Sequence, residues 1–199
     1  MRPRRYGGDS GQAFPIYITV VAGLLFLAFA YLAVGQAAGT RNEAQTAADA
    51  AALAAALEVR DQLAGEWLDN LKDPATWEGI FNGEVQVADA CGRAHQLAAR
   101  NDAHVQGCGP EGLLAYRVEV ETDEPVGDSI VPGTEGMHAT ASAKAVVEPR
   151  CTFELPAEGT GDEELPPLDC EGEEWELSPD DDPADLPDPE DLFEVHLAD

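Results

Sequence analysis

An uncharged, largely apolar run from Ala13 to Ala38 constrains the fold of this chain more than any other feature. As an α-helix its 26 residues would span about 39 Å, whereas the hydrocarbon core of a bilayer is about 30 Å thick. Pro15 falls in the first turn, where a missing backbone N–H costs nothing. The run therefore predicts one tilted transmembrane helix at residues 13–38.

The charges beside this run predict its orientation. The leader, residues 1–12, contains Arg2, Arg4 and Arg5, whereas Arg41 on the other side is followed by Glu43. Positively charged flanks stay in the cytoplasm. We therefore expect a single-pass protein of the cell membrane, with a cytoplasmic leader and an extracytoplasmic remainder.

A cleavable secretory signal is the alternative interpretation, with cleavage among the small residues Gly35–Gly39. The apolar part of such a signal is about 7–15 residues long. Ile16–Val34 is longer and leads into further helix-forming sequence, so retention in the membrane is favoured.

Alanine dominates the sequence after the apolar run, with nine alanines in Ala44–Ala56. Alanine has the highest helix propensity, and an apolar stripe continues at helical spacing through Leu53, Leu57, Ala64, Trp67 and Leu71. The membrane helix is therefore predicted to continue outward. Asp73-Pro74 predicts the end of this helix, with Asp73 as a candidate N-cap of a short helical turn that ends near Asn82-Gly83. A second helix is expected at about Glu84–Arg100.

Alternation of apolar and polar residues then replaces the helical period. Leu114, Tyr116, Val118 and Val120 alternate with charged residues and predict a half-buried strand. Further strands are expected at residues 103–106 and 139–147, with a long loop over 123–138. A helix lying on a small antiparallel sheet would bury these faces, which predicts an α+β domain at residues 39–149.

Residues 150–199 are acidic and rich in proline, with 19 of the 39 acidic residues and no Lys or Arg after Arg150. Such composition predicts a disordered tail, although Leu192, Phe193, Val195 and Leu197 form a short motif able to dock on a partner. The acidic run lacks the Gly and the terminal Glu of a calcium-binding EF-hand loop. The net charge of -28 argues against nucleic acid as a partner.

The cysteines number four, an even count that suggests disulfide bonds outside the cytoplasm. Three pairings are possible, and neighbour pairing is favoured, Cys91 with Cys108 and Cys151 with Cys170, because each closes a short loop worth about 3 kcal/mol. The alternative is a zinc site formed by Cys91, His95, His104 and Cys108, which are spaced C-x3-H-x8-H-x3-C.

Motifs of catalysis are missing from the sequence, which has no H-E-x-x-H, G-x-S-x-G or phosphate-binding glycine loop. Its histidines, His95, His104, His138 and His196, are interpreted as surface or filler residues. We therefore expect that the protein is not an enzyme and that it has no cofactor and no small-molecule substrate.

The N-terminal region resembles TadE/TadG-like Flp pilus-assembly proteins. The resemblance lies in the short basic leader, the apolar helix and the signature Q-x-A-A-D-A-A-A-L-A-A-A at Gln45–Ala56. The segment ACGRAHQLAARNDAHVQGC from Ala90 and the following strand also resemble actinobacterial secreted members, which extends the similarity to about Pro149.

This resemblance implies a pseudopilin-like component of pilus assembly or related secretion machinery, with a pilin-like domain and other membrane proteins of that machinery as partners. Processed pilins carry Glu at the fifth position after a cleaved Gly, but Ile16 stands there when counted from Gly11. A permanently anchored accessory protein therefore fits better than a polymerised subunit. The alternative is a membrane-tethered or secreted binding module that uses the acidic tail or the Cys/His set.

Small side chains let neighbouring helices approach closely. We therefore expect Ala47, Ala51 and Ala54 or Ala55 to line a helix contact with pilus components.

Overall fold

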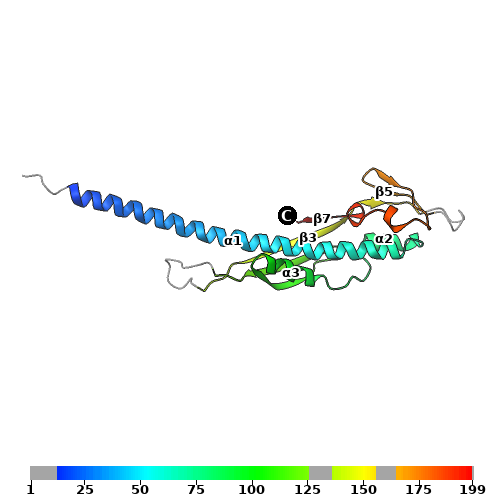
Figure 1. The fold of residues 1–199 in the computed structure, drawn as a ribbon, viewed down its shortest axis with the longest axis horizontal. Coiled ribbons are helices and arrows are strands. Elements are labelled where there is room, and N and C mark those ends of the chain that lie inside the picture. The colour runs from blue at the N-terminus through cyan, green and yellow to red at the C-terminus, as the bar shows by residue number, and fades with distance from the viewer. Residues whose placement is uncertain (1–12, 126–135, 156–164, 199) are drawn as a thin grey trace, which may run out of the picture.

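One helix, α1 (Ala13–Asp69), forms both the apolar segment and the backbone of the folded domain. The structure, a computed structural model, describes residues 13–125, 136–155 and 165–198. The 57 residues of α1 extend over about 86 Å. Its first half projects alone, and its second half lies along the domain (Figure 1). The predicted continuation of the apolar helix into the domain is confirmed.

A tight reversal follows the end of α1. The 3-10 helix η1 (Pro74–Thr76) and the short helix α2 (Trp77–Phe81) lie where a helical turn was predicted. The Asp73 side chain makes no capping hydrogen bond; its backbone oxygen instead accepts from Thr76 Oγ1 at 2.8 Å. At Gly83 the φ angle is +70° and an added Cβ would lie 2.7 Å from Leu114 Cδ2, so this turn requires glycine.

The helix predicted at 84–100 begins later than expected, because α3 spans only Cys91–Arg100. Residues 84–90 are irregular. Val85 and Val87 are half-buried and the residue between them, Gln86, is exposed, a period of two that a helix could not provide. The Ala88 N–H donates to Gln62 Oε1 on α1 at 2.5 Å, which fixes this segment against the long helix.

The main sheet contains four antiparallel strands in the order β1-β2-β3-β7. They are β1 (Ala103–Pro110), β2 (Ala115–Thr122), β3 (Thr140–Pro149) and β7 (Phe193–Leu197). The first three confirm the predicted strands, although β1 is longer than the predicted 103–106. Part of the predicted 123–138 loop, residues 126–135, lies outside the described residues.

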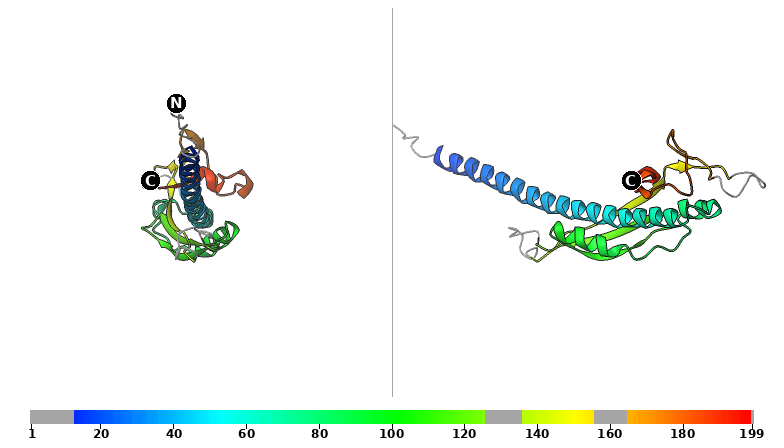
Figure 2. Two further views of the ribbon diagram at one scale, coloured as in Figure 1. Left: turned by 90° about the vertical axis from the view of Figure 1, so that its left-hand side faces the viewer. Right: turned by 45° about the vertical axis from the view of Figure 1, so that its right-hand side comes forward.

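The core lies between α1 and one face of this sheet. Helix α1 packs on β2, β3 and α3, and Figure 2 shows the sheet and α3 wrapped around one side of its second half. The sheet contributes Val118, Val120, Ala143, Ala145 and Val147, all at most 7% exposed. Alanines on both layers let the helix and the sheet approach closely, so the helix-on-sheet α+β prediction is confirmed.

The prediction of a disordered tail over 150–199 is wrong for residues 150–155 and 165–198. A second sheet contains β4 (Cys151–Thr152), β5 (Leu168–Cys170) and β6 (Glu173–Trp175), followed by η2 (Pro183–Asp185) and α4 (Pro189–Leu192). Leu168, Leu192 and Phe193 are at most 1% exposed. These few large side chains order the segment because each is buried in a core made by distant residues. Residues 156–164 and 199 of the predicted tail lie outside the described part.

Aromatic rings join this C-terminal region to the helices. The centroids of Trp67 and Trp77 are 5.6 Å apart, and those of Trp77 and Phe153 are 5.3 Å apart. Phe81 contacts Phe193 of β7 at 5.3 Å. The fourth strand of the main sheet is therefore held to α2 as well as to β3.

Candidate membrane anchor and assembly surface

The projecting half of α1 exposes an apolar surface with no counterpart in the rest of the described chain. Pro15–Leu32 is long and apolar enough to cross a membrane, and none of it is buried. Its 18 residues extend over about 27 Å. Large side chains such as Phe26 and Tyr31 are 72% and 83% exposed. An apolar surface of this extent marks a membrane or protein contact.

A short band of polar residues around Arg41, here called the polar band, separates this surface from the folded domain. Arg41 is the first charged residue after Leu32, about 14 Å further along the helix. Along the described part of α1, Ala44 is the first buried residue. The exposed apolar part of the helix therefore gives way to a buried core element within about three and a half turns.

A groove lies beside this band, where α1 meets the sheet. It has a volume of about 660 Å³, and a smaller cavity of about 270 Å³ shares Gln45 and Ser142 with it. We call the two together the junction groove. Its lining comprises Arg41, Asn42, Gln45, Asp49, Gln106, Arg117, Glu119, Val120, Thr140, Ala141, Ser142, Ala143, Lys144, Leu197 and Ala198.

A three-residue ion cluster borders the groove on the solvent face of the sheet. Arg117 and Lys144 stand directly opposite one another on β2 and β3, and Glu111 lies between them. Its carboxylate accepts from Arg117 Nε and, at 2.9 Å, from Lys144 Nζ. These hydrogen bonds, that of Arg117 first, lower the pKa of Glu111 from 4.5 to about 2. The carboxylate thus offsets the repulsion of two like charges facing across the strands.

The alanines expected at an intermolecular helix contact are covered by their own domain. Ala47, Ala51 and Ala55 are 0% exposed and Ala54 is 8% exposed. The helix that carries them packs on β2, β3 and α3 of the same chain. These positions are therefore core residues, and a partner could reach them only if the domain opened.

Two disulfides connect the cysteines in the neighbour pairing favoured by the sequence. Cys91 is bonded to Cys108 with an S–S distance of 2.00 Å, which ties α3 to β1. Both cysteines of the alternative zinc set are thereby oxidised. His95 is exposed on α3, and His104 Nδ1 lies 2.8 Å from Asp123 Oδ1. No group of three His, Cys, Asp or Glu side chains in the described residues is arranged to hold a metal ion.

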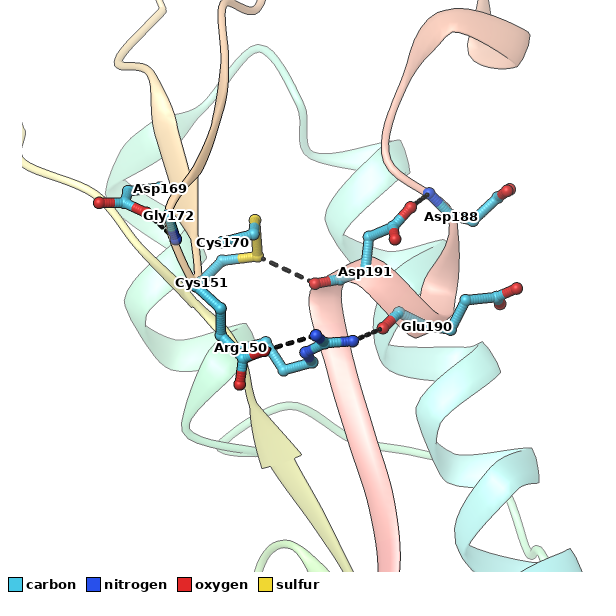
Figure 3. The surroundings of a disulfide bond; sticks show 9 residues. Arg150, Cys151, Asp169, Cys170, Gly172, Asp188, Glu190 and Asp191 are labelled. Atoms are coloured by element: carbon cyan, nitrogen blue, oxygen red, sulfur yellow. Dashed lines mark hydrogen bonds and ion pairs between the residues drawn. A yellow bond between two sulfur atoms is a disulfide. The ribbon is translucent and has the colours of Figure 1, made fainter.

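The second disulfide, Cys151–Cys170, lies beside α4 (Figure 3). Cys151 Sγ is 3.4 Å from Asp191 O, and Arg150 Nη1 donates to Glu190 O at 2.9 Å. The Arg150 backbone N–H also donates to Leu192 O at 2.9 Å. The last residues before β7 are thus held by two hydrogen bonds from Arg150.

Neither the junction groove nor the ion cluster was predicted from the sequence. Glu111 lies in the turn between β1 and β2, and its partners are 6 and 33 residues away. The one available signal was the alternation of charged residues at Arg117 and Glu119 in the predicted strand, which marks a solvent face but not a partner.

Residues 11–58 match the family model described as "Putative Flp pilus-assembly TadE/G-like". The match confirms the resemblance of the N-terminal region and supports a pilus-assembly component. It covers about a quarter of the chain and ends within α1, so the similarity suggested for residues 90–149 stays a prediction. No curated protein and no solved structure matches the chain.

Within the structure, the matched segment comprises the apolar surface, the polar band and the buried alanines of Ala44–Ala56. It includes Arg41, Asn42, Gln45 and Asp49 of the junction groove.

Proposed function

We propose that this chain is a membrane-anchored component of Flp pilus assembly or of related secretion machinery, with a structural rather than a catalytic role. The observation that carries the proposal is the coincidence of the family match with a fully exposed apolar helix. Such a helix has no place in water unless lipid or another protein covers it.

The second half of the same helix supports a permanent attachment. Because α1 runs without a break from the apolar surface into the core, removal of residues 13–38 would leave the domain attached to nothing. The domain would then leave the cell surface. We propose that the leader stays in the cytoplasm and that the domain faces outward, as the arginines of the leader favour.

The anchor is tested by placing charge in the apolar surface. Leu24 and Leu27 are 61% and 64% exposed, and each arginine at the centre of a membrane helix costs about 2.5–3.5 kcal/mol of insertion free energy. We expect Leu24→Arg/Leu27→Arg to move the protein from the carbonate-resistant membrane fraction to the soluble fraction or to degradation. The matched control is Leu68→Arg on the distal half of α1, where Leu68 is 39% exposed.

The pilus role and the orientation are tested in the source cells. Deletion of the gene should reduce surface pili, and the wild-type gene but not the double-arginine variant should restore them. A C-terminal epitope tag should be accessible on intact cells, and an N-terminal tag only after permeabilisation. Unchanged piliation after deletion would refute the pilus role, and recovery of a protein trimmed near Gly39 from the medium would refute permanent anchoring.

A further inference from the structure

Half of the β3 edge is left without a neighbouring strand. Strand β7 pairs with Ala145–Pro149 of β3 and ends there, whereas β3 begins at Thr140. On its other side β3 pairs with β2 down to Thr140. Lys144 O already accepts a hydrogen bond from Ala198 N. Within the described residues, Thr140–Ala143 therefore has a strand on one side only.

The backbone groups that face the open side follow from the hydrogen bonds around them. Val147 N donates to Leu114 O at 2.8 Å. The backbone N–H and C=O groups of odd-numbered β3 residues therefore point toward β2. Ala198 N donates to Lys144 O at 2.9 Å. The backbone groups of even-numbered β3 residues therefore point toward the β7 side. Because a residue in an antiparallel strand points its N–H and C=O the same way, Thr140 and Ser142 present both groups to the open side. Neither residue has a partner for them in the described part of the chain.

The junction groove lies in front of this edge, since Thr140 and Ser142 belong to its lining. Arg41, Asn42 and Gln45 of α1 also line it, together with Gln106 of β1 and Glu119 and Val120 of β2. Its volume of about 660 Å³ falls within the range of about 300–1,000 Å³ found for binding clefts. Thr140 and Ser142 thus line the groove and also carry the unpaired backbone groups.

This part of β3 also lacks the features that protect edge strands from pairing. The outer strand β1 has a bulge between Val105 and Gly107 and ends in Pro110, and bulges and prolines are devices that prevent edge pairing. The register of β2 and β3 shows no shift, and Thr140–Ala143 contains neither a charge nor a proline.

The charge of the groove selects the kind of segment. In a chain of net charge -28, the lining brings together Arg41, Arg117 and Lys144 against Asp49 and Glu119. Glu111 already binds Arg117 and Lys144, whereas Arg41 forms no ion pair with a described residue. An acidic side chain is the natural complement of the Arg41 guanidinium.

We propose that an extended, acidic segment of a partner protein binds in the junction groove and adds to the Thr140–Ala143 edge of β3 as a further strand. Main-chain hydrogen bonds to Thr140 and Ser142 supply the affinity, as in other cases of strand addition, and Arg41 supplies the preference for acid. The proposal does not depend on the orientation of the anchor.

The test uses the full-length protein in detergent micelles and the peptide acetyl-EVTVEVT-amide, with acetyl-KVTVKVT-amide as its basic counterpart. Hydrogen exchange followed by mass spectrometry should show slower exchange in fragments that cover 140–144 when the acidic peptide is added. We expect the basic peptide to bind at least ten-fold more weakly, and Arg41→Glu to weaken the acidic peptide at least ten-fold. The matched control is Arg100→Glu, an exposed position on α3 outside the groove, which should bind as the wild type does.

A backbone variant tests strand addition separately from charge. Ser142→Pro removes the N–H that faces the groove and leaves the ladder with β2 intact, a place where edge strands tolerate proline. It should abolish the protection, whereas Ser142→Ala should retain it. No protection with millimolar acidic peptide, equal binding of the two peptides, or protection of this edge by self-association without peptide would each overturn the proposal. If Ser142→Pro fails to fold, the Arg41→Glu comparison still decides.

Discussion

The burial of Phe193 makes a sharp prediction about the acidic C-terminal region. This side chain is 0% exposed, and its ring lies 5.3 Å from that of Phe81. Replacing a fully buried Phe with Ala costs about 3–5 kcal/mol of unfolding free energy, from lost burial and from the cavity that remains. For a domain of this size the loss corresponds to a decrease of about 6–20 °C in the melting temperature. We therefore expect Phe193→Ala to be among the most destabilising single changes in the chain.

The measurement is urea unfolding of the full-length protein in micelles, followed by tryptophan fluorescence, since Trp67 and Trp77 lie in the same aromatic cluster. The matched control is Leu155→Ala, because Leu155 is 53% exposed and surface changes cost within about 0.5 kcal/mol. A Phe81→Ala, Phe193→Ala double-mutant cycle should give a coupling of about 0.5–1.5 kcal/mol. A loss below about 1 kcal/mol for Phe193→Ala would refute the packing of β7 described above.

Three further predictions concern the disulfide, the ion cluster and the alanine stripe. Replacing Cys151 and Cys170 with Ser opens a loop of sequence separation 19 and should lower the unfolding free energy by about 3 kcal/mol; an unchanged urea midpoint would contradict this. The pKa of Glu111 is depressed from 4.5 to about 2, so its charge stabilises the fold above pH 4.5 and this contribution is lost as the pH falls toward 2. Glu111→Gln should therefore flatten the pH dependence of the urea midpoint in that window, and parallel curves would count against it. Ala51 is 0% exposed, so Ala51→Phe should lower the unfolding free energy by about 1–3 kcal/mol through overpacking. Ala38→Phe on the exposed half of α1 should leave it unchanged. Equal urea midpoints for the two variants would show that the alanine stripe is not buried.

The elements predicted from the sequence are those whose signal is local. Ala44–Ala56 has helix-forming composition whatever it packs against, and Leu114–Val120 alternates clearly enough to define both a strand and its buried face. The opposition of helix and sheet then follows, because each must bury one apolar face.

The predictions that were wrong depend on contacts between distant residues. The sequence around Val85 and Val87 is also compatible with a helix. The observed conformation depends on a distant contact, because the backbone just before α3 binds Gln62 of α1. In the tail, Leu168 and Phe193 are too widely spaced to form a periodic pattern, and their burial comes from rings and strands far away in the chain. Composition alone could not distinguish such a segment from disorder.

The alanine stripe illustrates a second limit. Small side chains favour close approach to any flat surface, so the sequence at Ala47 and Ala51 gives the same pattern for an intermolecular helix contact and for packing on the chain's own sheet. Only the fold identifies the surface that is met, and here β2, β3 and α3 occupy it.

The uninterrupted path of α1 from Leu32 to Ala44 has a mechanical consequence. No flexible tether lies between the two halves, so turning the first half about its axis turns the sheet by the same angle. In the proposed anchored state, tilt within the lipid would set the direction in which the β3 edge faces. A force that pulls the domain away from the membrane would likewise act on the buried alanines of the same helix. Extraction of the helix from the lipid and unfolding of the domain would then compete.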